Sequence, residues 1–393
     1  MRQKTKKFIS LFLSLALVLG LSSATMTGCS KKTAEKPERV YNRLNGDEKD
    51  TAEGERSVAI VVENTAAARP QWGINDEEYS PDIILQGEVE GGITRMLWFY
   101  SDMTKIPEQV GPLRSARPPF IKFSELFDSV FIHWGQSHTS EGYIGANTVF
   151  RKDKVDHINQ MSFNDEVGLY GRDTSRGVSS EHTGYLVGSK VKDAVSACDF
   201  SDKSDYKGLT FAAKTGDMGK DTCGSLNLKW SDRTESIDWK YNEDDNKYHS
   251  SNFDTDVARD NLIVLYDETE YQTKSNYQGA GGAVTYCDYK LNGGKGYVIS
   301  NGTKCEITWA VEDGNLVLRH LLTEKQKEEQ KAREKEAKEN DEEAVPVLGK
   351  VVKLNPGKSW IGWISDNNGG KISTTSYEKK AEAEDKADKS DAE

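Results

Sequence analysis

Long hydrophobic runs, paired cysteines and excess positive charge are all scarce in this chain of 393 residues. After one apolar stretch near the start, no run approaches the ~20 residues that a membrane-spanning helix needs. The five cysteines include no CxxC pair, so a zinc site is not expected. Asp and Glu (64) outnumber Lys and Arg (52), which gives a net charge of -12 and offers no broad basic surface. The composition therefore argues against nucleic acid as a partner.

Motifs of the common enzyme classes are also missing. The string "WGQSHTS" lacks the second glycine of the GxSxG nucleophile elbow, and no HExxH spacing occurs. "GAGGAV" at 279–284 lacks the strand and helix that a phosphate loop requires, so we interpret it as a turn. The sequence thus predicts neither a metal nor a cofactor. It leaves catalysis open but favours a non-enzymatic role.

The N-terminus has the features of a bacterial lipoprotein signal. Basic residues precede an apolar run at 8–21, and "MTGC" then places a small residue before Cys29. This pattern predicts a signal peptide at 1–28 and lipidation of Cys29, for example by palmitate, with ordinary secretion as the alternative. Residues 29–55 are polar and predict a disordered tether. We expect the protein on the extracytoplasmic face of the bacterial cell membrane, anchored through Cys29.

The first folded segment, 56–200, is predicted to be an α/β domain. Buried strands are expected in four apolar runs, at 57–64, 82–90, 93–100 and 129–135. Between the last two, Ser115 could cap a helix opened by proline, with Phe120, Phe123 and Phe127 on one side.

The second segment, 201–366, consists of short strand-forming stretches separated by Gly, Asn and Asp, and it predicts a mostly antiparallel β domain. Residues 322–344 carry opposite charges at spacing four without an apolar stripe, which favours an exposed helical insertion over a disordered stretch. The charged tail at 367–393 is predicted to be disordered. The expected fold class is α+β, an α/β domain followed by a β-rich domain.

Two neighbouring strings, "EVEGGITRML" and "GPLRSARPPF", carry the most concentrated candidate chemistry. In a strand, Glu88 and Glu90 would share one face, because side chains alternate with period two. The guanidinium groups that could meet them belong to Arg95, Arg114 and Arg117. The cluster could be a structural ion network, an anion- or glycan-binding cleft, or an acid and base acting on a glycan.

A second set of candidates follows the predicted strand at 129–135, where functional groups of open α/β sheets gather. Its members are polar or ionisable side chains that could bind a ligand: His133, Ser137, His138, Asp156, His157, Arg172 and His182. Their spacing supports neither a hydrolase triad nor a histidine metal site.

Four cysteines besides Cys29 could form two disulfides outside the cytoplasm. We favour the local pairs Cys198 with Cys223 and Cys287 with Cys305 among the three possible arrangements.

The ordered strings "VAIVVENTAAARPQWGI", "EVEGGITRML", "VGPLRSARPPF" and "SVFIHWGQS", with "KLNPGKSWIGW" near the other end, resemble the YerB-like bacterial lipoprotein family. Arg172 and His182 match family positions, whereas the neighbouring proline and asparagine of the family do not occur. The resemblance implies a lipid-anchored envelope protein, with peptidoglycan or penicillin-binding proteins as expected partners. We therefore predict a non-catalytic binding or scaffolding factor. The alternative is a glycan-cleaving enzyme that uses Glu88 or Glu90.

Overall fold

The computed structural model describes residues 41–48, 55–277 and 282–378. The predicted signal peptide, Cys29 and the end of the tail lie outside the described residues, as does part of the turn predicted at 279–284. Within the described residues, no helix combines the length and the apolar character needed to cross a bilayer.

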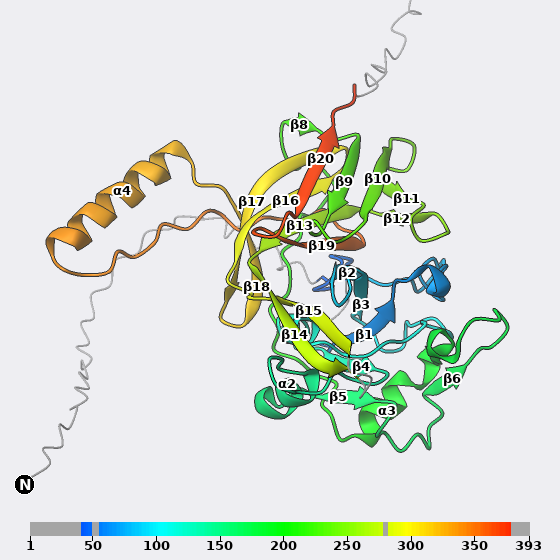
Figure 1. The fold of residues 1–393 in the computed structure, drawn as a ribbon. Helices are drawn as coiled ribbons and strands as arrows, with labels where there is room; N and C mark the ends of the chain where they lie inside the picture. Colours follow the sequence, from blue (N-terminus) through cyan, green and yellow to red (C-terminus); the bar gives the residue numbers. More distant parts are fainter. Residues whose placement is uncertain (1–40, 49–54, 278–281, 379–393) are drawn as a thin grey trace, which may run out of the picture. The chain divides into compact units, whose positions relative to one another are not determined.

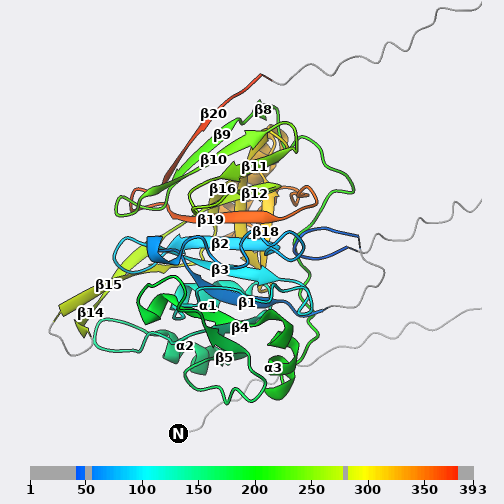
Figure 2. The ribbon, with the colours of Figure 1, turned by 90° about the vertical axis from the view of Figure 1, so that its right-hand side faces the viewer.

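One large mixed sheet organises the fold (Figures 1 and 2). Its strands are β1 (Val58–Glu63), β2 (Ile83–Glu88), β3 (Thr94–Tyr100), β4 (Val130–His133), β5 (His157–Asn159), β8 (Asp221–Thr222), β13 (Asn261–Asp267), β16 (Gly294–Ser300), β17 (Thr303–Glu312), β18 (Asn315–His320) and β19 (Ser359–Ser365). They follow the order β18-β17-β16-β13-β19-β2-β3-β1-β4-β5, and β8 pairs with β17.

Seven of the described strands of this sheet run in the same direction. Strand β19 pairs in parallel with β13 and β2, and β4 pairs in parallel with β1 and β5. Because β1 and β2 are both antiparallel to β3, they are parallel to each other. Strand β17 has this direction too, because it is antiparallel to β16, which is antiparallel to β13. The carboxyl ends of β17, β13, β19, β2, β1, β4 and β5 therefore lie at one edge of the sheet, which we call the carboxyl edge.

A second, five-stranded sheet packs against the first and has the order β12-β11-β10-β9-β20. Its strands are β9 (Ser225–Lys229), β10 (Ser236–Asn242), β11 (Lys247–Ser250), β12 (Val257–Arg259) and β20 (Lys371–Thr375). The two sheets meet through indole rings, since Trp239 lies 5.3 Å from Trp360 between ring centroids. Two hairpins complete the strands: β6 (Tyr170–Arg172) with β7 (Gly184–Leu186), and β14 (Thr269–Tyr277) with β15 (Gly282–Tyr289).

The helices are short apart from one. They are α1 (Pro118–Glu125), α2 (Ala146–Asp153), α3 (Val191–Ala197) and α4 (Glu324–Glu339), with 3-10 turns η1 (Ala66–Ala68), η2 (Ser180–His182) and η3 (Gly188–Lys190). Helix α1 begins with proline, as predicted. Proline has no backbone N–H, but the first turn of a helix has no hydrogen-bond partner for that group, so its absence costs no hydrogen bond. Its N-cap is Arg117 rather than the predicted Ser115, and no side chain caps it.

Apolar cores lie on both faces of the large sheet. In β1, Val58, Ile60 and Val62 join one core, whereas Ala59 and Val61 join the other. This arrangement explains the continuous apolar run that predicted a buried strand. Phe120 and Phe123 of α1 and the nearby Phe127 fill the second core, as their spacing predicted. The fold is thus mostly β with a small helical part, an α+β fold.

Three boundaries differ from the prediction. The large sheet crosses the boundary expected at 200/201, because β19 from the second segment pairs with β2 from the first. The tail expected to be disordered from 367 contributes β20, which pairs with β9. Residues 41–48 of the expected tether are folded: Tyr41 bridges to Glu48, and Leu44 is buried in the second core.

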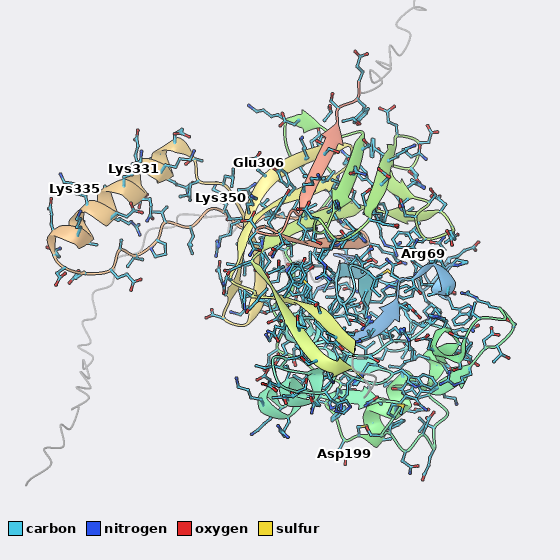
Figure 3. All side chains as sticks on the ribbon, in the orientation of Figure 1. Arg69, Asp199, Glu306, Lys331, Lys335 and Lys350 are labelled. Carbon is cyan, nitrogen blue, oxygen red and sulfur yellow. The ribbon has the colours of Figure 1, made fainter. Side chains whose placement is uncertain are left out.

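Helix α4 forms in the predicted insertion, and none of its residues is buried. Thr323 and Gln326 make a capping box at its N-terminus, which satisfies backbone N–H groups that the first turn leaves without partners. Figure 3 shows its charged side chains, Lys331 and Lys335 among them, projecting away from the ribbon. Hydrogen bonds from Gln326 to the carbonyl oxygen of Leu348 and from Val347 N–H to Gln330 fasten it to the returning chain.

Candidate functional site

Several of the parallel strands end in a polar residue at the carboxyl edge. Glu63 ends β1, Glu88 ends β2, His133 ends β4 and Asn159 ends β5. In open sheets with parallel strands, ligands bind outside the carboxyl ends because the following loops converge there. This edge is therefore where the predicted site residues should meet, but the structure separates them into several groups.

Glu90 forms the first group with two arginines. Arg117 reaches it with Nη2 at 2.6 Å and Nε at 2.9 Å, and Arg95 reaches it with Nη2 at 2.9 Å. Burial alone would raise the pKa of Glu90, but the two guanidinium groups lower it well below its ordinary range. The Glu90 carboxylate is therefore a fixed anion paired with two buried cations, which agrees with the structural ion network among the sequence-based alternatives.

Glu88 lies in different surroundings. Its side chain is fully buried, one oxygen accepts a hydrogen bond from Tyr271 at 3.1 Å, and Oε1 has no hydrogen-bond partner among the described residues. Burial raises the pKa of Glu88. The prediction that Glu88 and Glu90 share a strand face is wrong, since β2 ends at Glu88 and the two carboxylates contact different groups.

Gly91 and Gly92 form the turn that follows Glu90, with φ of 69° and 76°. Glycine is required at Gly92, because a Cβ there would lie 2.5 Å from the carbonyl oxygen of Arg233. This turn returns the chain to β3, where Arg95 can fold back onto Glu90.

Arg114 belongs to a second group, not to the Glu90 network. Its Nε lies 3.4 Å from Glu63, and its Nη1 lies 2.9 Å from Glu181. The other oxygen of Glu63 lies 2.8 Å from Nδ1 of His182. Arg114 and His182 thus meet at a buried carboxylate that the sequence analysis did not single out.

A cleft of about 580 Å³ opens beside this second group at the ends of β4 and β5. Its lining includes three of the predicted residues: Arg114, His138 and Arg172. The Arg172 guanidinium lies 4.4 Å from the Trp134 ring centroid and donates to Thr183 Oγ1 at 3.0 Å and to the Ser180 carbonyl oxygen. It forms no ion pair within the described part of the chain, so its charge is available to a ligand in the cleft.

The remaining predicted residues have structural roles. His133 is fully buried, lies 3.0 Å from His157 between ring nitrogens, and stacks on Phe150. Burial lowers the pKa of His133 to about 3, so its ring stays neutral. His157 also stacks on Phe150, and burial lowers its pKa too.

A hydrolase triad is not assembled. Ser137 Oγ accepts hydrogen bonds from Tyr143 Oη at 2.7 Å and from Ala146 N–H at 3.0 Å. Asp156 pairs with Arg56 at 2.6 Å. In the described ranges, no group of three or more His, Cys, Asp or Glu residues is placed to hold a metal ion.

The predicted disulfides are not formed. Cys198, Cys223, Cys287 and Cys305 are all free thiols. The favoured pairs lie on separate elements: Cys287 is in β15, opposite Tyr271, whereas Cys305 is in β17, opposite Val298. Cys198 follows α3 and Cys223 follows β8, and each packs with the apolar residues of the first core.

Sequence analysis missed several groups at the cleft, among them Glu63, Asn159 and Glu181. The sequence did carry a signal for Glu63, because a glutamate at the end of an otherwise apolar strand needs a polar or charged partner when it is buried. Glu181 carried no comparable signal, since it lies in a polar loop whose position only the fold determines.

The comparisons show what the part of the chain that carries this site is similar to. Residues 44–201 match the family model described as "Protein of unknown function (DUF3048) N-terminal domain". Every residue of the cleft described above lies within that match.

One particular relative is the protein described as "Putative lipoprotein YerB" of Bacillus subtilis (strain 168). This chain is 26% identical to it over 368 residues, which cover 88% of this chain and 94% of the relative. The crystal structure of the YerB protein from Bacillus subtilis matches with a TM-score of 0.61 at 23% identity, covering 85% of this chain and 100% of that chain, a likeness of fold. The comparisons confirm the resemblance to the YerB-like family.

Proposed function

We propose that this protein is a membrane-anchored lipoprotein of the cell envelope that binds an anionic wall polymer in the cleft at the carboxyl edge, without cleaving it. The anchor is the predicted acyl chain on Cys29. The similarity to a relative described as a lipoprotein supports this part of the proposal.

One observation carries the binding role: Arg172 is an exposed cation inside a cleft and has no ion-pair partner in the described ranges. The ring of Trp134 holds the guanidinium in place, which lowers the entropy lost when an anion binds. Arg114 adds a second cation that is shared with two carboxylates. In a chain with a net charge of -12, such a pair of guanidinium groups favours phosphate or carboxylate groups of a ligand.

The cleft also suits a carbohydrate backbone. Amides of Gln136 and Asn159 line it together with Trp134 and Met161, and Met161 is 70% exposed. Polar groups that fix orientation beside apolar surface are typical of ligand sites. A polymer of sugars or polyols that carries acidic groups would use both kinds of contact.

The test is co-sedimentation of the purified protein with peptidoglycan sacculi that retain their anionic polymers. A charge-assisted hydrogen bond contributes roughly 1.5–3 kcal/mol, so Arg172→Gln should weaken retention about tenfold or more. Arg176→Gln is the matched control, because Arg176 also lies over an indole ring, that of Trp72, but does not line the cleft. Equal retention of Arg172→Gln and wild type would refute the proposal.

The geometry gives no support to glycan cleavage by Glu88 or Glu90. Glu88 is sealed from solvent, and Glu90 is an anion held between two arginines. The same sedimentation assay also tests glycan cleavage. Soluble glycan fragments that the wild type releases and the Glu88→Gln variant does not would establish cleavage. Penicillin-binding proteins remain predicted partners, and retention of one of them on the immobilised protein would test that prediction.

A further inference from the structure

Asn159 is held in a fixed orientation at the wall of the cleft that also contains Arg172. It ends β5, and its side-chain oxygen Oδ1 accepts hydrogen bonds from the backbone N–H of Gly135 at 2.9 Å and of Met161 at 3.2 Å. Asparagine is favoured in such turns because its short side chain can bond the backbone two residues on. The two backbone donors identify the amide oxygen, so the other end of the amide is the nitrogen Nδ2.

The amide nitrogen of Asn159 has no hydrogen-bond partner within the described part of the chain. Asn159 is only 6% exposed, and it lines the cleft. Its Nδ2 atom is nevertheless accessible, in contrast to Glu88 Oε1, which is sealed in the core. A nearly buried donor without a partner costs free energy, and a ligand that accepts a hydrogen bond from Nδ2 would recover it.

Arg172 has one free edge of its guanidinium group and lines the same cleft. Its Nη1 donates to the Ser180 carbonyl oxygen and to Thr183 Oγ1, which leaves Nε and Nη2 without hydrogen-bond partners among the described residues. Such an edge can donate two parallel hydrogen bonds to two oxygens of one anion. Asn159 then adds a third donor from a different element, β5 instead of β6.

The number of these donors distinguishes between two anionic groups that polymers carry. A carboxylate has two oxygens in one plane, and both are used by the guanidinium edge. A phosphodiester has four oxygens in a tetrahedral arrangement, so a further oxygen is left for a separate donor. On the basis of the binding role proposed above, we propose that the cleft takes a phosphodiester group of the polymer, and that Asn159 Nδ2 determines this specificity by donating to an oxygen that a carboxylate lacks.

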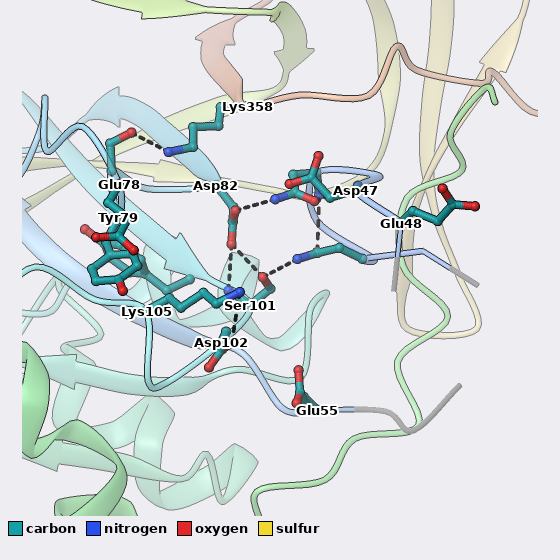
Figure 4. Close-up of a pocket in the computed structure, with 14 residues that line it drawn as sticks. Asp47, Glu48, Glu55, Glu78, Tyr79, Asp82, Ser101, Asp102, Lys105 and Lys358 are labelled. Carbon is teal, nitrogen blue, oxygen red and sulfur yellow. Dashed lines mark hydrogen bonds and ion pairs between the residues drawn. The ribbon is translucent and has the colours of Figure 1, made fainter. Parts of the chain in front are cut away.

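The opposite edge of the large sheet disfavours such a ligand. Asp82 and Lys358 directly precede β2 and β19, so they mark the amino ends of these parallel strands. Figure 4 shows the cavity of about 470 Å³ to which they belong, where six carboxylates face only two cations, Lys105 and Lys358. Because like charges repel, a polyanion avoids this cavity, and its binding should depend on residues of the cleft.

The experiment is titration calorimetry of the purified protein with two soluble polymers of matched length and charge density. Poly(glycerol phosphate) carries phosphodiesters, and polygalacturonate carries carboxylates. Wild type should bind poly(glycerol phosphate) about tenfold more tightly, because one more charge-assisted hydrogen bond forms. Equal affinities, or tighter binding of polygalacturonate, would overturn the proposed specificity and leave the binding role intact. Binding of neither polymer would refute the binding role, and the specificity with it.

Asn159→Asp assigns the specificity to one atom. The substitution keeps an oxygen for the N–H groups of Gly135 and Met161 but replaces the Nδ2 donor by a second oxygen. The added negative charge should weaken binding of both polymers, whereas loss of the donor should remove the tenfold difference between them. The ratio of the two affinities is therefore the measurement that a merely electrostatic effect would not change.

Asn147→Asp is the matched control. Asn147 Oδ1 also accepts a hydrogen bond from a backbone N–H, that of Thr139 at 2.9 Å, but Asn147 does not line the cleft. This variant should keep the tenfold preference for the phosphodiester polymer. A preference that persists in Asn159→Asp, or that is lost equally in Asn147→Asp, would overturn the role of Asn159. The comparison of polymers on wild type decides the ligand class even when Asn159→Asp does not fold.

Discussion

The surroundings of Glu88 and Glu90 differ sharply, although only one residue separates the two. Glu90 is partly buried between the buried side chains of Arg95 and Arg117, which balance its negative charge. Glu88 is buried more completely, but it accepts a hydrogen bond from a hydroxyl group and forms no ion pair, and one of its oxygens has no hydrogen-bond partner in the described ranges. The charge of Arg233 lowers the pKa of Glu88, but burial has the larger effect and raises it. Burial raises the pKa of both carboxylates, but the net shifts are opposite because close ion pairs are present only at Glu90.

This difference indicates which charged groups at the carboxyl edge stabilise the fold. Removing one partner of a buried ion pair leaves an uncompensated charge, which is costly. Replacing a buried acid that already lacks compensation by its neutral amide costs little or stabilises the fold. The following predictions test this contrast, beginning with the largest expected effect.

Arg117→Met should destabilise the protein by about 3–5 kcal/mol, because Glu90 would lose its closest partner inside the fold. Chemical denaturation gives the free energy of unfolding. Arg333→Met in α4 is the control, since it breaks an exposed pair with Glu329 worth about 0.5 kcal/mol or less. A loss below 1 kcal/mol at Arg117 would mean that the Glu90 network is not structural.

Gly92→Ala should cost about 1–3 kcal/mol for the backbone conformation, with a further steric cost from the Arg233 carbonyl. Gly91→Ala is a matched comparison, because its φ is also positive but a Cβ would meet nothing within 4 Å. Denaturation midpoints should therefore rank Gly92→Ala below Gly91→Ala and both below wild type. Equal losses would show that the turn can move away from Arg233.

Glu88→Gln should leave the free energy of unfolding at neutral pH unchanged or raise it by about 1 kcal/mol, because a buried and incompletely paired charge is removed. Denaturation at pH 7 measures this change. Destabilisation by more than 1 kcal/mol would show that the ionised Glu88 has a compensating partner. The contrast with Glu90 would then fail.

The pH dependence should separate the two acids by sign. For Glu88, whose folded pKa is raised, stability should fall as the pH rises above the unfolded value of about 4.3, and Glu88→Gln should remove this slope. For Glu90, whose folded pKa is lowered, stability is present above that value and is lost as the pH falls towards the folded pKa. Denaturation midpoints measured from about pH 3 to about pH 7 would show both slopes of stability against pH.

Local patterns in the sequence predicted local structure well. The apolar run at 57–64 became β1, the proline and phenylalanine spacing became α1, and the charged insertion became α4. The pairing of Glu90 with arginines was also predictable, because a buried carboxylate next to a turn needs cations and the nearby strings supply them.

Long-range relations were not predictable in this way. Strands β19 and β2 pair in parallel although they are far apart in the sequence. The apolar pattern of each strand predicts a strand but does not indicate which other strand it pairs with. For the same reason the separation of Arg114 from the Glu90 network was missed, since Glu63 and Glu181 reach Arg114 only through the fold. The cysteine pairs were wrong because spacing along the chain does not determine distance between strands.

The bridge between Tyr41 and Glu48 has a mechanical consequence for a protein held by Cys29. The described residues start at Tyr41, which is 41 − 29 = 12 residues beyond the proposed acylated cysteine. Even when fully extended, a segment of this length spans at most about 40 Å. The protein would therefore work only in the layer next to the bilayer surface, and any wall polymer that it captures would have to pass through that layer.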